Sequence, residues 1–310
     1  MSQRRPVGRR NAVLGIGSLF ASACARAESR VSDPKSASFW IGGDVYLARG
    51  RTPKLAEGLD HLLGGATGIV NLEGPIGDEA PAAGDGEIRL ANAPSSLAQL
   101  RAANVRVVGI ANNHESDLGP GSVERTHRAL VSEGFAPCHG VATEIVIGGT
   151  RIGITAHDLA PQSGNDRIRE DLARAHDVDL LVATFHVTGP PSYLPRPELR
   201  SAIDTALRAG ARVIVAHGTH ALAPVERRDD AVIAWGLGNL VFDCTCTQEV
   251  DGGILHVTIE GNRIQAKIIP VDAGLDGKPA RPAHNAALIF ELLAAIGSSP
   301  LEPKGDFASF

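Results

Sequence analysis

The sequence predicts an α/β fold with mixed sheets. Short apolar runs that are typical of buried strands alternate with segments of helical spacing, and this alternation favours parallel strands covered by helices. Two further pairs of strands, joined by Gly148-Gly149 and by Gly261-Asn262, are typical of β-hairpins and add antiparallel strands. Hydrophobic residues make up 43% of the 310-residue chain, which is enough for a buried core.

The predicted elements follow one another with helices between many of the strands. Apolar or alternating runs predict strands at residues 39–41, 68–72, 105–110, 144–147, 151–156, 179–185, 213–215, 232–235, 236–242, 253–259 and 263–271. Helical spacing predicts helices at residues 55–63, 95–103, 122–133, 198–208 and 285–296. Ser122 and Gly134 are the start and stop signals of the third helix.

The first 27 residues have the layout of a secretory signal peptide. A basic stretch with Arg9-Arg10 precedes an apolar run over residues 12–25, and Ala25-Arg26-Ala27 offers small residues to a signal peptidase. The arginine pair favours the twin-arginine route. We therefore expect an exported protein, periplasmic or extracellular. Membrane anchoring through lipidation of Cys24 is the alternative to soluble release, because residues 21–24 loosely resemble a lipoprotein cleavage box.

The rest of the chain is predicted to hold one domain. Residues 28–37 are polar and turn-rich and are interpreted as a linker, residues 38–272 as the domain, and residues 273–310 as a tail with one helix. Without the leader the cysteines are Cys138, Cys244 and Cys246, an odd number, so a disulfide framework does not organise the fold, and any single bridge among them stays open. The net charge of −5 without a basic stripe excludes nucleic acid as the expected partner.

Polar residues fall at the ends of successive apolar strands. Asp44, Glu73, Asn113-His114, His186 and His217 each stand within a residue or two of such an end. Carboxyl ends of parallel strands share one edge of a sheet, where open α/β folds build their sites. Carboxylate, amide oxygen and imidazole suit Mn, Zn or Fe, and a bridging carboxylate can hold two metals. By contrast, His157 and Asp158 are interpreted as a surface pair.

The order of these residues resembles the motifs of the calcineurin-like metallophosphatases, and most closely the CapA/PgsA-type capsule-synthesis proteins associated with poly-γ-glutamate. The matching stretches are Gly-Gly-Asp-Val (42–45), Asn-Leu-Glu-Gly-Pro (71–75), Ala-Asn-Asn-His-Glu-Ser-Asp-Leu-Gly (111–119), His-Gly-Thr-His (217–220), Glu226 and Trp-Gly-Leu-Gly-Asn-Leu-Val-Phe-Asp (235–243). The resemblance covers residues 38 to 245 and implies a four-layer α/β/β/α sandwich.

The resemblance also implies a role for each site residue. Asp44 would bind a first metal, Glu73 would bridge, Asn113 and His186 would bind the second metal, and His217 and His220 would supply one imidazole to each. His114 would act as acid or electrophile, oriented by Asp117. One ligand departs from the phosphatase pattern, because Tyr46 stands where those enzymes have a histidine. We therefore expect one tight and one weak metal site.

Three functions are compatible with these residues. The first is an exported CapA-like protein that takes part in synthesis, export or anchoring of an anionic capsule polymer such as poly-γ-glutamate, together with membrane-bound synthesis and export proteins. The second is a metal-dependent phosphoesterase, a hydrolase of unknown substrate. The third is a non-catalytic polymer-binding module with a degraded metal site, which Tyr46 favours.

Overall fold

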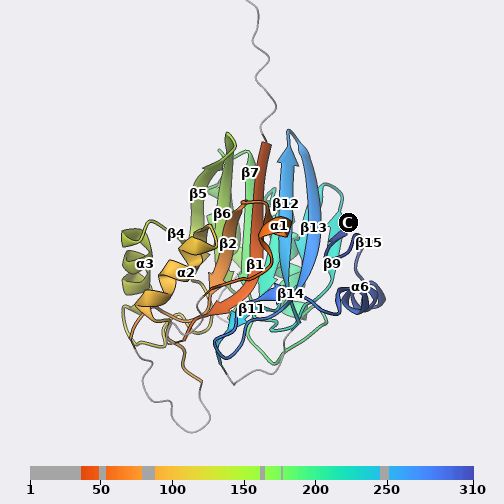
Figure 1. The fold of residues 1–310 in the computed structure, drawn as a ribbon. Helices are drawn as coiled ribbons and strands as arrows, with labels where there is room; N and C mark the ends of the chain where they lie inside the picture. Colours follow the sequence, from red (N-terminus) through yellow and green to blue (C-terminus); the bar gives the residue numbers. More distant parts are fainter. Residues whose placement is uncertain (1–35, 49–53, 79–87, 161–164, 176, 245–250) are drawn as a thin grey trace, which may run out of the picture. The chain divides into compact units, whose positions relative to one another are not determined.

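Two mixed β-sheets form the centre of the structure, a computed structural model that describes residues 36–48, 54–78, 88–160, 165–175, 177–244 and 251–310 (Figure 1). The prediction of an α/β fold with mixed sheets is confirmed. The predicted signal peptide, with Cys24, and nearly all of the predicted linker lie outside the described residues, as does Cys246. Within the described ranges, no helix has the length and apolar character needed to cross a membrane.

The first sheet has ten strands in the described residues, eight of them in the order β15-β16-β13-β12-β1-β2-β3-β4, while β11 pairs with β1 and β14 with β13. Its parallel strands β1, β2, β3 and β4 are joined by an antiparallel hairpin, β12 and β13. The bounds are β1 Ser36–Tyr46, β2 Thr67–Leu72, β3 Val105–Gly109, β4 Ala136–Cys138, β11 Asn239–Phe242, β12 Asp251–Glu260, β13 Arg263–Asp272, β14 Arg281–Pro282, β15 Glu302–Pro303 and β16 Ala308–Ser309.

The second sheet has six strands in the order β5-β6-β7-β8-β10-β9. Its strands are β5 Gly140–Ile147, β6 Thr150–Asp158, β7 Leu180–His186, β8 Val213–His217, β9 Val225–Arg228 and β10 Ala231–Ala234. The helices of the described chain are α1 Asp60–Leu63, α2 Leu97–Ala102, α3 Ser122–Ser132, α4 Asn165–Ala173, α5 Pro197–Arg208 and α6 Ala286–Ala295, and a short 3-10 helix, η1, covers Pro94–Ser96.

The two sheets pack face to face, and their alternating side chains explain why. Phe39 and Ile41 of β1 point into the shared core, where they meet Ile154 and Val182 of the second sheet. Trp40, between them on β1, belongs to the cluster on the opposite face. Each fully buried aliphatic or aromatic side chain of this core contributes about 1.5–3 kcal/mol to folding.

Helices cover the outer faces of both sheets. Leu100 of α2 and Leu130 of α3 belong to the cluster on the outer face of the first sheet (Figure 1). Leu199 and Ile203 of α5 pack against Ile214 of the second sheet. Both faces of the parallel strands are therefore buried, which accounts for their almost continuous apolar runs.

The structure differs from the predicted elements at several places. Residues 55–63 were predicted as one helix, but the helix is only α1, because the main chain of Leu55 and Glu57 hydrogen-bonds to Ala280 instead. The first strand runs on through both glycines to Tyr46. Gly43 allows this, because a Cβ there would overlap the carbonyl oxygen of Gly238 beside it. Beyond residue 273, the short strands β14, β15 and β16 accompany α6.

Candidate metal centre

The carboxyl ends of five strands position the predicted site residues. Asp44 lies on β1 and Glu73 directly follows β2, which runs parallel to β1 with Asp44 opposite Asn71. The Asn112-Asn113-His114 segment follows β3 in the same sheet. His186 and His217 end the parallel strands β7 and β8 and stand opposite each other in register. The shared edge predicted from the sequence is therefore present, and both sheets contribute to it.

Asp44, Glu73 and His186 form the centre of the site. Each offers a ligand atom, and these atoms all lie within 4.8 Å of one another. All three side chains are buried, with no more than 2% of each residue exposed. One oxygen of Glu73, Oε2, is buried without a hydrogen-bond partner. An orphaned carboxylate oxygen beside a second carboxylate and an imidazole fits a divalent cation.

Asp44 is held by donors from three directions. Asn71 Nδ2 donates to its Oδ1 at 2.9 Å, and the main-chain N–H of Gly218 donates to its Oδ2 at 2.8 Å. His217 Nδ1 lies 3.3 Å from Oδ1. Burial alone would raise the pKa of Asp44, but its interactions with His217, first the hydrogen bond and then the charge, hold that pKa below its usual range. Asp44 is therefore ionised, which is the form that could bind a cation.

His186 is a neutral imidazole oriented by two amides. Burial lowers the pKa of His186 to about 3. Asn71 Nδ2 lies 3.3 Å from Nδ1 and can only donate, so Nδ1 accepts and Nε2–H donates to Asn113 Oδ1 at 2.7 Å. The side chains of His186 and Asn113, predicted to bind the same metal, thus contact each other.

The ionised form of Glu73 is disfavoured in this site. Its pKa is raised well above the usual value, first by burial and then by the nearby charges of Asp44, Asp117 and Asp158. Two buried carboxylates in such proximity disfavour the doubly ionised state unless a cation lies between them. The chemistry of this donor set therefore fits a divalent cation held by Asp44, Glu73 and His186.

The predicted catalytic pair lies at the mouth of this cluster. His114 Nδ1 and Asp117 Oδ2 are 2.7 Å apart, and Asp117 Oδ2 also accepts the main-chain N–H of Leu90 at 2.7 Å. The other ring nitrogen of His114, Nε2, lies 3.8 Å from Glu73 Oε1. The contact between Nδ1 and Asp117 thus directs Nε2 of His114 toward Glu73.

The loop after β8 brings the two remaining imidazoles to the carboxylates. His217 adjoins Asp44, whereas His220 Nε2 lies 3.9 Å from Glu73 Oε1 and its Nδ1 is 3.0 Å from Asn239 Oδ1. Gly218, between them in the chain, has a φ of +75°, and a Cβ there would lie 2.8 Å from His186 Nε2. Only glycine fits this close approach.

Tyr46 does not extend the ligand set. Its ring packs against Phe242 at a centroid distance of 5.5 Å, in a small apolar cluster that includes Leu90. Cys244, next to this cluster, is disulfide-bonded, whereas Cys138 is a free buried thiol, so Cys138 is not its partner. Tyr46 therefore adds no donor to the cluster of Asp44, Glu73 and His186.

A cavity of about 280 Å³ opens onto the cluster. Its floor is polar, with Glu73, His114 and His186, and its walls are largely apolar. The wall residues are Ile88, Leu90, Thr188, Gly189, Pro190, Pro191 and Phe242. Asn113 and His220 also line this space, so a bound molecule would contact the predicted ligands directly.

The sequence analysis did not identify the role of Asn112 in the site, and it placed His157 at the surface. Asn112 Oδ1 accepts the main-chain N–H groups of Gly74 and His114, which shapes both loops; the doubled asparagine after a buried strand was the available signal. The interpretation of His157 as part of a surface pair is wrong. His157 is only 6% exposed because its ring stacks on Phe185 inside the fold.

The residues of the site lie inside a region with recognisable relatives. Residues 40–145 and 147–244 match the model of the bacterial capsule synthesis protein PGA_cap family. The chain belongs to this family. The resemblance to CapA-type capsule proteins is therefore confirmed, and the PGA_cap region includes Asp44, Glu73, Asn113, His186, His217 and His220.

Two relatives of this PGA_cap chain have names that concern capsule material. It is 24% identical over 206 residues to "Capsule biosynthesis protein CapA" of Bacillus anthracis, covering 57% of this chain and 50% of that protein. It is 26% identical over 219 residues to "PGA biosynthesis protein CapA" of Bacillus subtilis, covering 61% of this chain and 56% of that protein. The chain thus spans about half the length of the curated relatives it matches.

The fold itself occurs in a solved structure. A hypothetical protein from Thermus thermophilus superposes with a TM-score of 0.53 at 13% sequence identity, over 75% of this chain and 99% of the other. At this identity the likeness concerns the fold alone.

Proposed function

We propose that this chain is an exported CapA-like protein that acts in the synthesis, export or anchoring of an anionic capsule polymer such as poly-γ-glutamate, through a dinuclear metal site. Its two sheets and outer helices would constitute the four-layer α/β/β/α sandwich of the metallophosphatases. The observation that carries the proposal is the buried cluster of Asp44, Glu73 and His186, with its orphaned Glu73 oxygen, in a member of a capsule-synthesis family.

The donors divide between two metal positions. Glu73, Asn113, His186 and one imidazole would hold a tight site, and Asp44, Glu73 and the other imidazole a weaker one. Mn, Zn or Fe suits this mixture of oxygen and nitrogen donors. When bound, such ions supply Lewis-acid polarisation of a phosphoryl or carbonyl oxygen.

A metal-dependent phosphoesterase is the second candidate, and the His114–Asp117 pair favours it. Asp117 Oδ2, 2.7 Å from Nδ1, holds the ring so that Nε2 points toward the cavity floor, where it could give a proton to a leaving group. The third candidate, a polymer-binding module without catalysis, is favoured by Tyr46, which packs against Phe242 instead of serving as a ligand.

The location and partners of the protein belong to the same proposal. The export signal over residues 1–27 supports a periplasmic or extracellular site of action, with Cys24 lipidation as the alternative to soluble release. Membrane-bound capsule synthesis and export proteins would be its partners, and the anionic polymer or a phosphoester its substrate. The net charge of −5 argues against nucleic acid.

Metal analysis followed by substrate screens separates these functions. Purified protein would be assayed for bound metal and then for cleavage of phosphodiester and γ-glutamyl substrates, with and without chelator. Cleavage lost with chelator and reduced roughly 100-fold by His114→Ala supports a hydrolase. Bound metal without cleavage, unchanged by His114→Ala, argues against the phosphoesterase. Unaltered polymer production in a deletion strain contradicts the capsule role.

A further inference from the structure

A second and larger cavity lies at the opposite end of the sheets from the metal centre. Its volume is about 640 Å³, and it includes Arg212, which directly precedes β8, whereas His217 ends that strand at the metal centre. Asn262 and Arg263, at the turn between β12 and β13, also line it. That turn adjoins the start of β1, since Ser36 pairs with Glu260, while Asp44 lies toward the other end of the same strand.

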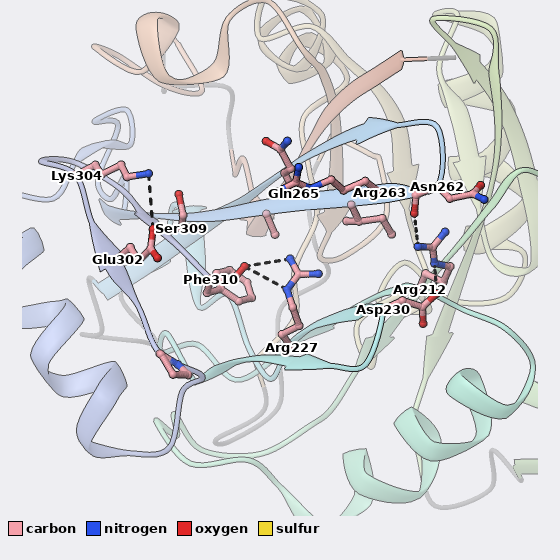
Figure 2. Close-up of a pocket in the computed structure, with 13 residues that line it drawn as sticks. Arg212, Arg227, Asp230, Asn262, Arg263, Gln265, Glu302, Lys304, Ser309 and Phe310 are labelled. Atoms are coloured by element: carbon pink, nitrogen blue, oxygen red, sulfur yellow. Dashed lines mark hydrogen bonds and ion pairs between the residues drawn. The ribbon is translucent and has the colours of Figure 1, made fainter. Parts of the chain in front are cut away.

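We call this cavity the basic groove. Its lining consists of Arg212, Arg227, Asp230, Asn262, Arg263, Ile264, Gln265, Ala266, Pro300, Glu302, Lys304, Ser309 and Phe310. Figure 2 shows Arg227 on β9 of the second sheet facing the C-terminal segment at Phe310, and Gln265 on β13 of the first sheet. Four of them are cationic and two are acidic, whereas the whole chain carries a net charge of −5. The groove thus concentrates positive charge on an otherwise acidic protein.

Two guanidinium groups are held in place within the groove. Arg212 Nη2 donates to the Asn262 carbonyl oxygen at 2.7 Å while its Nε lies 2.8 Å from Asp230 Oδ2. Arg227 donates from Nε and Nη2 to the main-chain oxygen of Phe310, at 3.3 and 3.0 Å (Figure 2). In the described residues these contacts use Nε and Nη2 of each arginine and not Nη1. A guanidinium fixed in this way recognises a carboxylate with little loss of side-chain entropy.

The other two cations stand at the rim. Arg263 and Lys304 are exposed, and Lys304 has only a distant acidic neighbour, Glu302 Oε2 at 3.9 Å. Gln265 and Ser309 add polar groups between the cations. Two guanidinium groups held by hydrogen bonds, together with two exposed cations, suit a ligand that presents several negative charges along its length, because each charge meets a separate donor.

We propose that the basic groove binds a polycarboxylate chain, the anionic polymer of the proposed function. The identity of the polymer rests on the proposed function. The location of its binding site rests on the charge and volume of the groove. The cavity is more than twice the 280 Å³ of the metal-centre cavity, and no residue lines both. The polymer is therefore held at one end of the sheets, while the metal centre lies at the other.

Fluorescence anisotropy with labelled poly-γ-glutamate tests this proposal. We expect the full chain to bind the polymer in a salt-sensitive manner, and the double variant Arg263→Gln/Lys304→Gln to bind roughly tenfold more weakly. The matched control is Arg128→Gln/Arg169→Gln, which removes the same charge from exposed positions on α3 and α4 and should bind like the unmodified protein. All four positions are exposed, so circular dichroism should show intact folding.

The outcomes separate the groove from the metal centre. Equal loss in both double variants, or none in either, overturns the groove while leaving the metal-centre proposal standing. Equal affinity for dextran sulfate overturns carboxylate recognition. If His186→Ala, which alters the metal centre, abolishes polymer binding while Arg263→Gln/Lys304→Gln does not, the polymer binds at the metal centre instead.

Discussion

Replacing Gly218 with alanine tests how tightly the loop after β8 is fitted to the site. The added Cβ would overlap the Val187 carbonyl oxygen and lie 2.8 Å from His186 Nε2. The φ of +75° adds about 1–2 kcal/mol of backbone strain for a residue with a Cβ. Overlap with main-chain atoms adds about 1–3 kcal/mol. We expect Gly218→Ala to lower the free energy of unfolding by roughly 2–5 kcal/mol in urea denaturation.

The same change should weaken metal binding. Moving the loop would displace His186 and lengthen the 2.8 Å hydrogen bond from the Gly218 N–H to Asp44 Oδ2, so affinity in a metal titration should fall roughly 10–100-fold. Gly210→Ala is the matched control, because Gly210 also has a positive φ, +90°, but has open space around it. It should show the backbone strain alone. Equal destabilisation by both variants, with metal affinity unchanged in Gly218→Ala, would refute the close fit.

Three further predictions concern the buried polar groups. Burial and the charge of Asp44 raise the pKa of Glu73 in the folded protein. The protein therefore loses folding stability as the pH rises from the ordinary pKa of a glutamate to the raised one. In urea denaturation at pH 8, metal-free Glu73→Gln should be more stable than the unmodified protein by about 1–3 kcal/mol, and it should bind less metal. Burial lowers the pKa of His157 from 6.5 to about 4, so the unfolded chain takes up a proton at a higher pH than the folded protein. As the pH falls from 6.5 to 4, this difference should lower the free energy of unfolding by about 2–3 kcal/mol. His157→Gln should therefore flatten the slope of stability against pH. Asn71→Leu removes the donor to Asp44 and His186 and should weaken metal binding roughly 10–100-fold, with calorimetric titration as the measure; undiminished affinity would contradict its orienting role.

Much of the centre could be predicted because its residues follow the strands that place them. Asp44, Glu73 and His186 are each marked by a preceding apolar run, and parallel pairing then brings the strand ends together. The pairing of His114 with Asp117 could also be predicted, because the two residues are three positions apart and their side chains meet in one turn.

The parts that sequence reasoning missed depend on contacts between distant segments. The stretch at residues 55–63 has helical spacing, but Leu55 O accepts the N–H of Ala280 and Glu57 N–H donates to Ala280 O, and these bonds to a distant segment override the local preference. Burial of His157 depends on stacking against Phe185 of the neighbouring strand. Likewise, the basic groove is lined by residues of β9, of the β12–β13 turn and of the segment at residues 300–310, and no local sequence pattern indicates that these segments lie together.

Elemental analysis of the purified protein, after incubation with Mn, Zn or Fe and removal of loose metal, tests the central claim most directly. We expect about one tightly held equivalent of metal per chain, a second that is held weakly, and loss of the tight equivalent in His186→Ala with retention of the fold. Absence of bound metal under all three conditions, or the same metal content in His186→Ala as in the unmodified protein, would contradict it.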